Sequence, residues 1–128
     1  MYALTELQIA VMRVLWLRGE ATVLEVQEAL QPNRPLAQTT VATLLSRLEK
    51  RGVVAYRMDG RQYVYRPLIT EDEVRSSALA EVKDLLFEGD VATLVSQLLS
   101  AEEVGPADLA KVRRMIEGRE RELKEKRR

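Results

Sequence analysis

The segment from residue 36 to residue 67 constrains the fold most, because it predicts one helix followed by a two-stranded hairpin. The apolar side chains of its first half recur at i, i+3, i+4 and i+7, the spacing of a helix with one buried stripe: Val41, Leu44, Leu45 and Leu48. Gly52 then ends the helical pattern, and residues 53–57 alternate as a strand. Asp59-Gly60 is expected to form a type I′ turn, after which residues 62–66 return as the second strand.

The side of this helix opposite the apolar stripe is free to meet a partner. At about 100° per residue, its centre carries hydroxyl and cationic side chains, namely Thr39, Thr43, Ser46 and Lys50, with Arg47 at the edge and Thr40 further round. No carboxylate lies at that centre, so the face suits base edges and phosphate oxygens. Any surface helix is polar on one side, however. The helix by itself therefore does not distinguish a DNA-binding face from an ordinary solvated one.

The hairpin favours the DNA-binding interpretation. Arg57, Arg61 and Arg66 flank the turn among three tyrosines, and one acidic residue accompanies them. Arginine binds phosphate, and a tyrosine buries its ring while its hydroxyl forms hydrogen bonds. A half-buried hairpin often carries tyrosines but seldom three arginines. The helix and hairpin together predict a winged helix that binds double-stranded DNA, with Arg57, Arg61 and Tyr63 as candidate contacts on the wing.

Composition limits the other possibilities. A chain of 128 residues with 46% hydrophobic content is enough for one compact domain and an appendage. It contains no run of 18 apolar residues, and no basic leader precedes an apolar stretch, so we expect a cytoplasmic protein without membrane insertion. It also has no cysteine and no histidine, which predicts no disulfide, no metal site and no cofactor.

The zero net charge of the chain conceals a separation of charge along the sequence. Residues 34–66 carry 7 basic and 2 acidic side chains, whereas residues 67–104 carry 2 basic and 9 acidic ones. The positive block coincides with the predicted helix and hairpin, so its field attracts a polyanion. The basic residues after position 104 are a weaker sign, because charged helix ends are usually only solvated.

Two further helices are predicted upstream, at residues 6–18 and 23–30. Thr5 and Thr22 each begin a capping box, and Pro32 follows the second helix. The first helix has a predicted buried stripe of Leu7, Val11, Val14 and Leu15. Its Trp16 is better interpreted as a core or interface anchor than as a base-stacking platform. Residues 1–68 are thus predicted to form a winged helix-turn-helix DNA-binding domain.

The remaining residues, 69–128, are predicted to form three amphipathic helices without a sheet. About sixty residues bury too little apolar surface to offset the loss of chain entropy, so we expect a second copy to cover them. The alternative is that they fold back on their own winged helix. This predicts a helical dimerisation region whose candidate contacts are Leu79, Val82, Leu86, Leu94, Val95, Leu98, Leu99, Leu109, Val112 and Ile116. A symmetric dimer also suits DNA, because two recognition helices one turn apart read a pseudo-palindrome.

The chain resembles the penicillinase-repressor family of bacterial winged-helix regulators, which includes the methicillin-resistance and copper-responsive repressors. The resemblance rests on the order and spacing of residues 6–16, 22–30, 39–52, 60–67 and 93–117. It implies a homodimer that represses transcription by occupying a promoter operator, with the third helix in the major groove and the wing on the backbone. By matching position it implies DNA contacts from Thr39, Thr40, Thr43, Arg47, Lys50, Arg61 and Tyr63.

The same resemblance bears on how repression ends. In the β-lactam-responsive members a membrane-bound sensor protease triggers cleavage in the dimerisation region, and the matching bond here is Gln97-Leu98. Those members have Asn-Phe at that bond. The copper-responsive branch uses a C-terminal cysteine cluster, and this chain has no cysteine, which excludes copper sensing by that route.

Three other functions would each require features of their own. An enzyme without histidine or cysteine would depend on carboxylates, and the adjacent acids at 72–73 and 102–103 diverge on a helix, so we predict no catalysis. A winged helix used as a protein-interaction module would depend on buried aromatic residues rather than on salt. A winged-helix regulator controlled by a small ligand would need an apolar pocket near Trp16 and the C-terminal helices.

Overall fold

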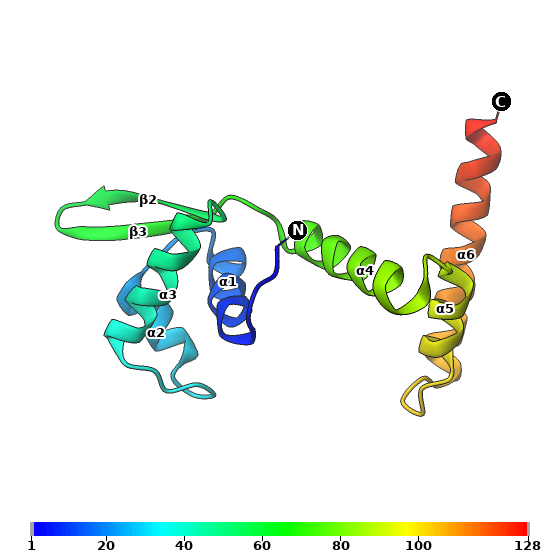
Figure 1. Ribbon diagram of the computed structural model, residues 1–128, viewed down its shortest axis with the longest axis horizontal. Coiled ribbons are helices and arrows are strands. Elements are labelled where there is room, and N and C mark those ends of the chain that lie inside the picture. The colour runs from blue at the N-terminus through cyan, green and yellow to red at the C-terminus, as the bar shows by residue number, and fades with distance from the viewer. Residues whose placement is uncertain (1, 128) are drawn as a thin grey trace. The chain divides into compact units, whose positions relative to one another are not determined.

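The computed structural model of the chain describes residues 2–127 and is mainly helical with a small antiparallel sheet (Figure 1), which confirms the predicted fold class. The helices are α1 (Glu6–Arg18), α2 (Val23–Leu30), α3 (Gln38–Lys50), α4 (Glu71–Phe87), α5 (Val91–Leu99) and α6 (Pro106–Lys126). The strands are β1 (Ala21–Thr22), β2 (Val54–Asp59) and β3 (Gln62–Pro67). The residues divide into two compact units, one ending at Ala80 and the other beginning at Glu81.

The core of the first unit lies among α1, α2, α3 and the sheet. Val41, Leu45 and Leu48 of α3 are fully buried, as their spacing predicted, and Leu44 packs against them from the edge. Side chains from the other helices and from the base of the hairpin complete the core: Val11, Met12, Leu15, Ala21, Val26, Leu30, Val53, Val54, Tyr65 and Ile69. Burial on this scale stabilises a domain by about 1.5–3 kcal/mol for each large apolar side chain.

The buried side of α1 differs from the predicted stripe. Met12 is fully buried and Gln8 nearly so, whereas Leu7 and Val14 are only half-buried. The reason is that α1 packs against α2, α3 and β3 at once, which buries a wider arc than one stripe. Gln8 tolerates burial because its Oε1 accepts a hydrogen bond from the Thr5 backbone N–H at 3.0 Å, as part of the capping box.

The sheet has one strand more than the predicted hairpin. β1 pairs with β3, so the strand order is β1-β3-β2, and all pairs are antiparallel. The predicted Asp59-Gly60 type I′ turn is wrong, because Asp59 pairs with Gln62 and the loop is Gly60-Arg61. Gly60 has φ +63°, and Arg61 is not among the positive-φ residues of the part described. This is the pattern of a type II′ turn, with glycine at its first central position.

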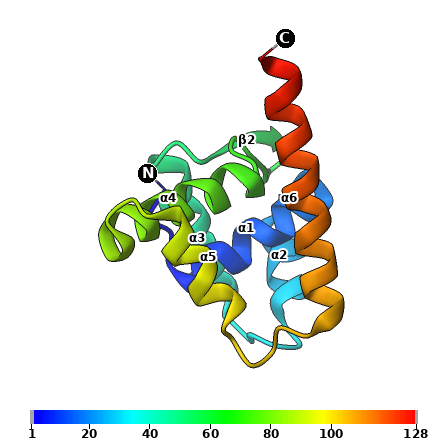
Figure 2. The ribbon, with the colours of Figure 1, turned by 90° about the vertical axis from the view of Figure 1, so that its right-hand side faces the viewer.

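The second unit has no buried side chain among its described residues. Its apolar side chains stay largely exposed along α4, α5 and α6, and α6 is one unbroken helix in both views (Figures 1 and 2). Within residues 2–127, no helix combines the length and apolar character needed to cross a membrane. The first unit continues beyond the predicted boundary at residues 68 and 69, because Val74 of α4 packs against the winged-helix core.

Candidate nucleic-acid interface

The outer side of α3 is open to a partner. Five of its predicted contact residues are exposed and Ser46 is half-buried; the exposed ones are Thr39, Thr40, Thr43, Arg47 and Lys50. The Thr43 hydroxyl donates to the Thr39 carbonyl at 3.0 Å. Thr43 therefore offers a partner its oxygen lone pair and its methyl group rather than its proton, and a threonine methyl is a suitable contact for thymine.

Long-range hydrogen bonds fix both ends of α3. Before the helix, the Leu36 carbonyl accepts a hydrogen bond from Gln27 Nε2 at 3.0 Å. After the helix, Arg51 Nη1 donates to the Ala3 carbonyl at 3.1 Å and to Gln8 Oε1 at 3.3 Å. These contacts hold the exposed side of α3 in one orientation. The sequence did not single out Arg51, because a cation in the last turn of a helix is common without any such partner.

One face of the wing borders α3. The register places Tyr56 opposite Tyr65, and Tyr63 shares their face because side chains alternate along a strand. The Tyr56 and Tyr63 rings lie 4.8 Å apart and are nearly perpendicular, which is a favourable aromatic geometry. A groove of about 350 Å³ separates these tyrosines from α3, lined by Val23, Ala42, Ser46, Glu49, Tyr56, Tyr63 and Tyr65. Burial raises the pKa of the Tyr65 phenol, with neighbouring Tyr63 as a second cause.

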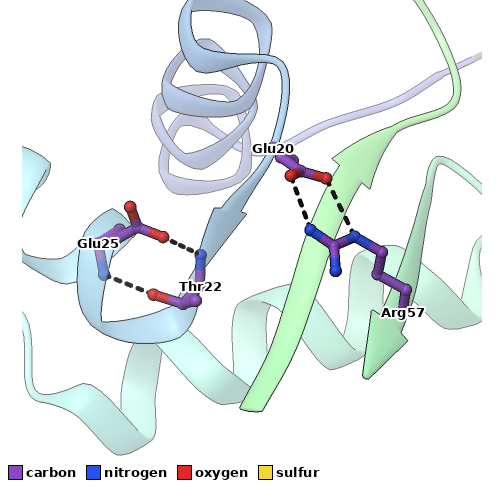
Figure 3. Close-up of polar contacts among 4 residues, drawn as sticks. All are labelled: Glu20, Thr22, Glu25 and Arg57. Atoms are coloured by element: carbon purple, nitrogen blue, oxygen red, sulfur yellow. Dashed lines mark hydrogen bonds and ion pairs between the residues drawn. The ribbon is translucent and has the colours of Figure 1, made fainter. Parts of the chain in front are cut away.

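The other face of the wing carries Arg57, which is committed to an ion pair (Figure 3). Its Nη2 lies 2.8 Å from Glu20 Oε1 and its Nε lies 3.3 Å from Glu20 Oε2. The pair reaches across β3 and joins β2 to the residue before β1. Nearby, the Thr22 hydroxyl and the Glu25 carboxylate form the reciprocal capping box of α2. The structure thus does not bring Arg57 together with the α3 residues, because strand alternation puts it on the opposite face from Tyr63.

Arg61 lies at the tip of the wing, on the α3 side. It lines a cleft of about 230 Å³ together with Gln38, the first residue of α3, and with Thr22, Val23, Leu24, Gln62 and Tyr63. Among residues 2–127, the ion pairs include neither Arg61 nor the α3 cations Arg47 and Lys50. The exposed side of α3 and the wing tip therefore present cations that have no carboxylate partner in the part of the chain described.

The ion pair of the wing predicts a dependence of stability on acid. The hydrogen bond from Arg57 lowers the pKa of Glu20, and the one from Arg34 lowers the pKa of Glu6. Each carboxylate thus binds a proton less readily in the folded state, so its contribution is fully present above its ordinary pKa of 4.5 and is lost as the pH falls through the lowered value. We expect Glu20→Gln to lower the midpoint of thermal unfolding at neutral pH, and the difference from the unaltered chain to vanish in acid.

Scanning calorimetry from pH 7 downward would measure this difference. Glu28→Gln is the matched control, since Glu28 is an exposed carboxylate of α2 outside the ion pairs of residues 2–127. A Glu20→Gln effect that stays constant down to pH 2 would contradict a role for the ionised pair.

Comparison with known proteins identifies relatives of this chain. A model of the penicillinase repressor family matches residues 4–118. Transcriptional regulator BlaI of Mycobacterium tuberculosis is 43% identical over an alignment of 86 residues that covers 63% of this chain and 62% of the length of that protein. Methicillin resistance regulatory protein MecI of Mammaliicoccus sciuri is 21% identical over 115 residues, covering 90% of this chain and 94% of MecI.

One solved structure resembles about the first half of this chain, and another resembles nearly all of it. The DNA binding domain of the repressor BlaI matches with a TM-score of 0.51 and 30% identity, covering 56% of this chain and 87% of that domain. A MarR family protein from Bacillus stearothermophilus matches with a TM-score of 0.53 over 96% of this chain and 77% of its own, and at 19% identity it shows a likeness of fold alone. Because the family model extends over nearly all of the sequence, from residue 4 to residue 118, the chain belongs to the penicillinase repressor family.

Proposed function

We propose that this chain is a DNA-binding transcriptional repressor that occupies a pseudo-palindromic promoter operator as a homodimer. The observation that carries the proposal is the open outer side of α3, where Arg47 and Lys50 are exposed; like Arg61 at the wing tip, neither has a carboxylate partner among residues 2–127. The names of its relatives, a transcriptional regulator and a repressor with a DNA binding domain, support the same function. Promoter DNA of a bacterium lies in the cytoplasm, so we place the chain there.

In this proposal α3 lies in the major groove and the wing lies on the backbone. The α3 residues that would meet base edges or adjacent phosphates are Thr39, Thr40, Thr43, Ser46, Arg47 and Lys50. Arg61 would bind a phosphate, and Tyr63 would place its ring and hydroxyl at the side of the α3 groove. Arg57 has no place in this set, since its guanidinium holds Glu20 on the opposite face.

The homodimer is proposed from the exposed apolar side chains of the second unit. None of its described residues is buried, although α5 is mostly apolar and the polar helix α6 carries apolar side chains at helical spacing. A second copy of the same surface would remove this apolar area from water. The proposed contacts are Leu79, Val82, Leu86, Leu94, Val95, Leu98, Leu99, Leu109, Val112 and Ile116.

A sensor protease as a partner is a separate part of the proposal and rests on the Gln97-Leu98 bond alone. Both residues are exposed, and the bond lies inside the helix α5. Proteases act most readily on exposed segments that can leave regular structure, so cleavage here would require α5 to open locally. Mass spectrometry of the chain from cells treated with a β-lactam tests this, and a fragment ending at Gln97 is the expected product.

Selection of genomic fragments by the purified protein, at physiological salt with excess competitor DNA, tests the main proposal. Sequencing of the retained fragments should give a pseudo-palindrome upstream of particular genes. If a folded, dimeric protein enriches no sequence, the repressor proposal fails in this form. That result would favour a winged helix that binds a protein partner, or a regulator that needs a ligand before it binds DNA.

Replacing Arg61 with alanine is expected to weaken binding by a similar factor on operator and on random DNA. The reason is that a phosphate contact carries no sequence information, while its loss lowers the salt dependence of binding by about one counterion. Fluorescence anisotropy titrations at several salt concentrations measure both quantities. A loss confined to the operator would contradict a backbone role for Arg61.

A further inference from the structure

The segment between the wing and α4 is held to the winged helix at two points. Trp16 of α1 donates through Nε1 to the Ile69 carbonyl at 2.8 Å, a contact between residues 53 positions apart. One residue earlier, the Leu68 N–H donates to the Val53 carbonyl at 2.9 Å. Ile69 itself is 9% exposed and belongs to the core. The connecting segment therefore leaves the winged helix in a direction that these contacts define.

The first turns of α4 are also part of the winged-helix unit. Val74 packs against the core, and the Thr70 hydroxyl accepts the Glu73 N–H at 3.0 Å, which fixes where the helix begins. Glu71 and Arg75 form an ion pair at 2.9 Å along the same turn. The compact unit ends only at Ala80, while α4 continues without a break to Phe87. The recognition helix and the start of α4 thus share one packed body.

We propose that Trp16 is a positioning residue that determines which spacing between operator half-sites the repressor accepts. The inference rests on the proposed function, because it requires two copies joined through residues that follow the first turns of α4. In such a dimer, the direction in which α4 leaves its own winged helix determines the orientation of α3, the recognition helix. Recognition helices must meet the same face of the duplex, and about five base pairs turn the DNA through half a helical turn. If the start of α4 were less firmly held, the dimer would also bind operators whose half-site spacing the unaltered protein binds poorly.

Among the restraints on this segment, the Trp16 hydrogen bond is one that a conservative substitution can remove. The chain has a single tryptophan, and it donates its only N–H to Ile69. Phenylalanine at this position keeps an aromatic ring against the core but leaves the Ile69 carbonyl without that donor. A purely structural Trp16 would affect binding to all DNA alike, because it would change only the folded fraction. A positioning Trp16 affects the ratio between spacings.

The test uses the full chain and duplexes that carry the selected pseudo-palindrome with the half-site spacing changed by about one, two or five base pairs. The unaltered protein should prefer its best spacing over the half-turn spacing by about tenfold or more. Trp16→Phe is expected to reduce this preference about threefold to tenfold, the range that corresponds to the loss of one hydrogen bond. Its affinity for a single half-site should stay within about twofold of the unaltered chain.

Two further variants keep the result interpretable. Val74→Ala loosens the first turns of α4 while retaining Trp16, and it should also reduce the spacing preference. This variant tests the proposal even if Trp16→Phe does not fold. Val26→Ala removes core volume from α2, where Val26 is fully buried, and should lower stability without changing the preference. An unchanged spacing preference in Trp16→Phe and Val74→Ala overturns the proposal, and so does an equal reduction in Val26→Ala. A selection that enriches no operator overturns the proposed function and this inference together, whereas a clear operator with unchanged preference overturns this inference alone.

Discussion

Replacing Leu98 with glutamate is expected to turn the proposed dimer into monomers and to weaken operator binding about 10²-fold to 10⁴-fold. Leu98 is 58% exposed and lies on the apolar stripe of α5 with Leu94, Val95 and Leu99. In a dimer that buries this stripe, a carboxylate at position 98 would lose its hydration without gaining a partner, at a cost of several kcal/mol. Each monomer would then bind one half-site, and the advantage of a linked second site would be lost.

Analytical ultracentrifugation and operator titration measure the two effects on one sample. Gln97→Glu is the matched control, because it places the same charge one residue away on the same helix, off the apolar stripe. We expect this control to stay dimeric and to bind the operator as the unaltered chain does. A Leu98→Glu protein that still sediments as a dimer would show that the centre of the interface lies elsewhere in the chain.

Replacing Arg47 with alanine is expected to lower operator affinity about tenfold to a hundredfold and to relax the preferred sequence at one position. Arg47 lies exposed on α3 without an ion-pair partner among residues 2–127, so its guanidinium is available for two hydrogen bonds to one base edge. Such a bidentate contact contributes about 1–3 kcal/mol of discrimination between bases. Random DNA, which offers only backbone contacts, should lose much less affinity.

Titration of operator and scrambled duplexes at one salt concentration, followed by a repeated selection with the variant, measures affinity and preference. Arg13→Ala removes one positive charge from the exposed side of α1 and controls for charge alone. Equal losses on both duplexes would assign Arg47 to the backbone. The contrast with Arg61→Ala, for which equal losses are expected, separates the two kinds of contact.

Local sequence patterns predicted much of the winged helix. The structure confirms the bounds 6–18 and 23–30 for α1 and α2, because each begins with a threonine whose capping partner lies three residues ahead. The apolar stripe of α3 was likewise predictable, since the period of a helix decides which side chains lie together. The family and the fold class followed from the order of these same segments.

The candidate site was predictable only in part. The exposure of Thr39, Thr43 and Lys50 follows from helical geometry, whereas Ser46, predicted at the centre of the same face, is half-buried beside the wing tyrosines. The sequence did not show that Arg57 is held in an ion pair while Arg61 is not, because the partner of Arg57 is Glu20, which lies 37 residues earlier in the chain. β1 was missed for a related reason: two residues are too few to show a strand pattern, and they become a strand only when β3 lies beside them.

The sequence by itself determined where α1 and α2 begin and end, which side of α3 is apolar and where positive charge gathers. Each of these depends on interactions within a few residues, or on the sign of the charges alone. Only the tertiary structure decided which face of the wing meets α3, which arginine is held by a carboxylate and how Trp16 holds the start of α4. Those outcomes depend on groups far apart in the chain, and they are settled by packing, which no local pattern encodes.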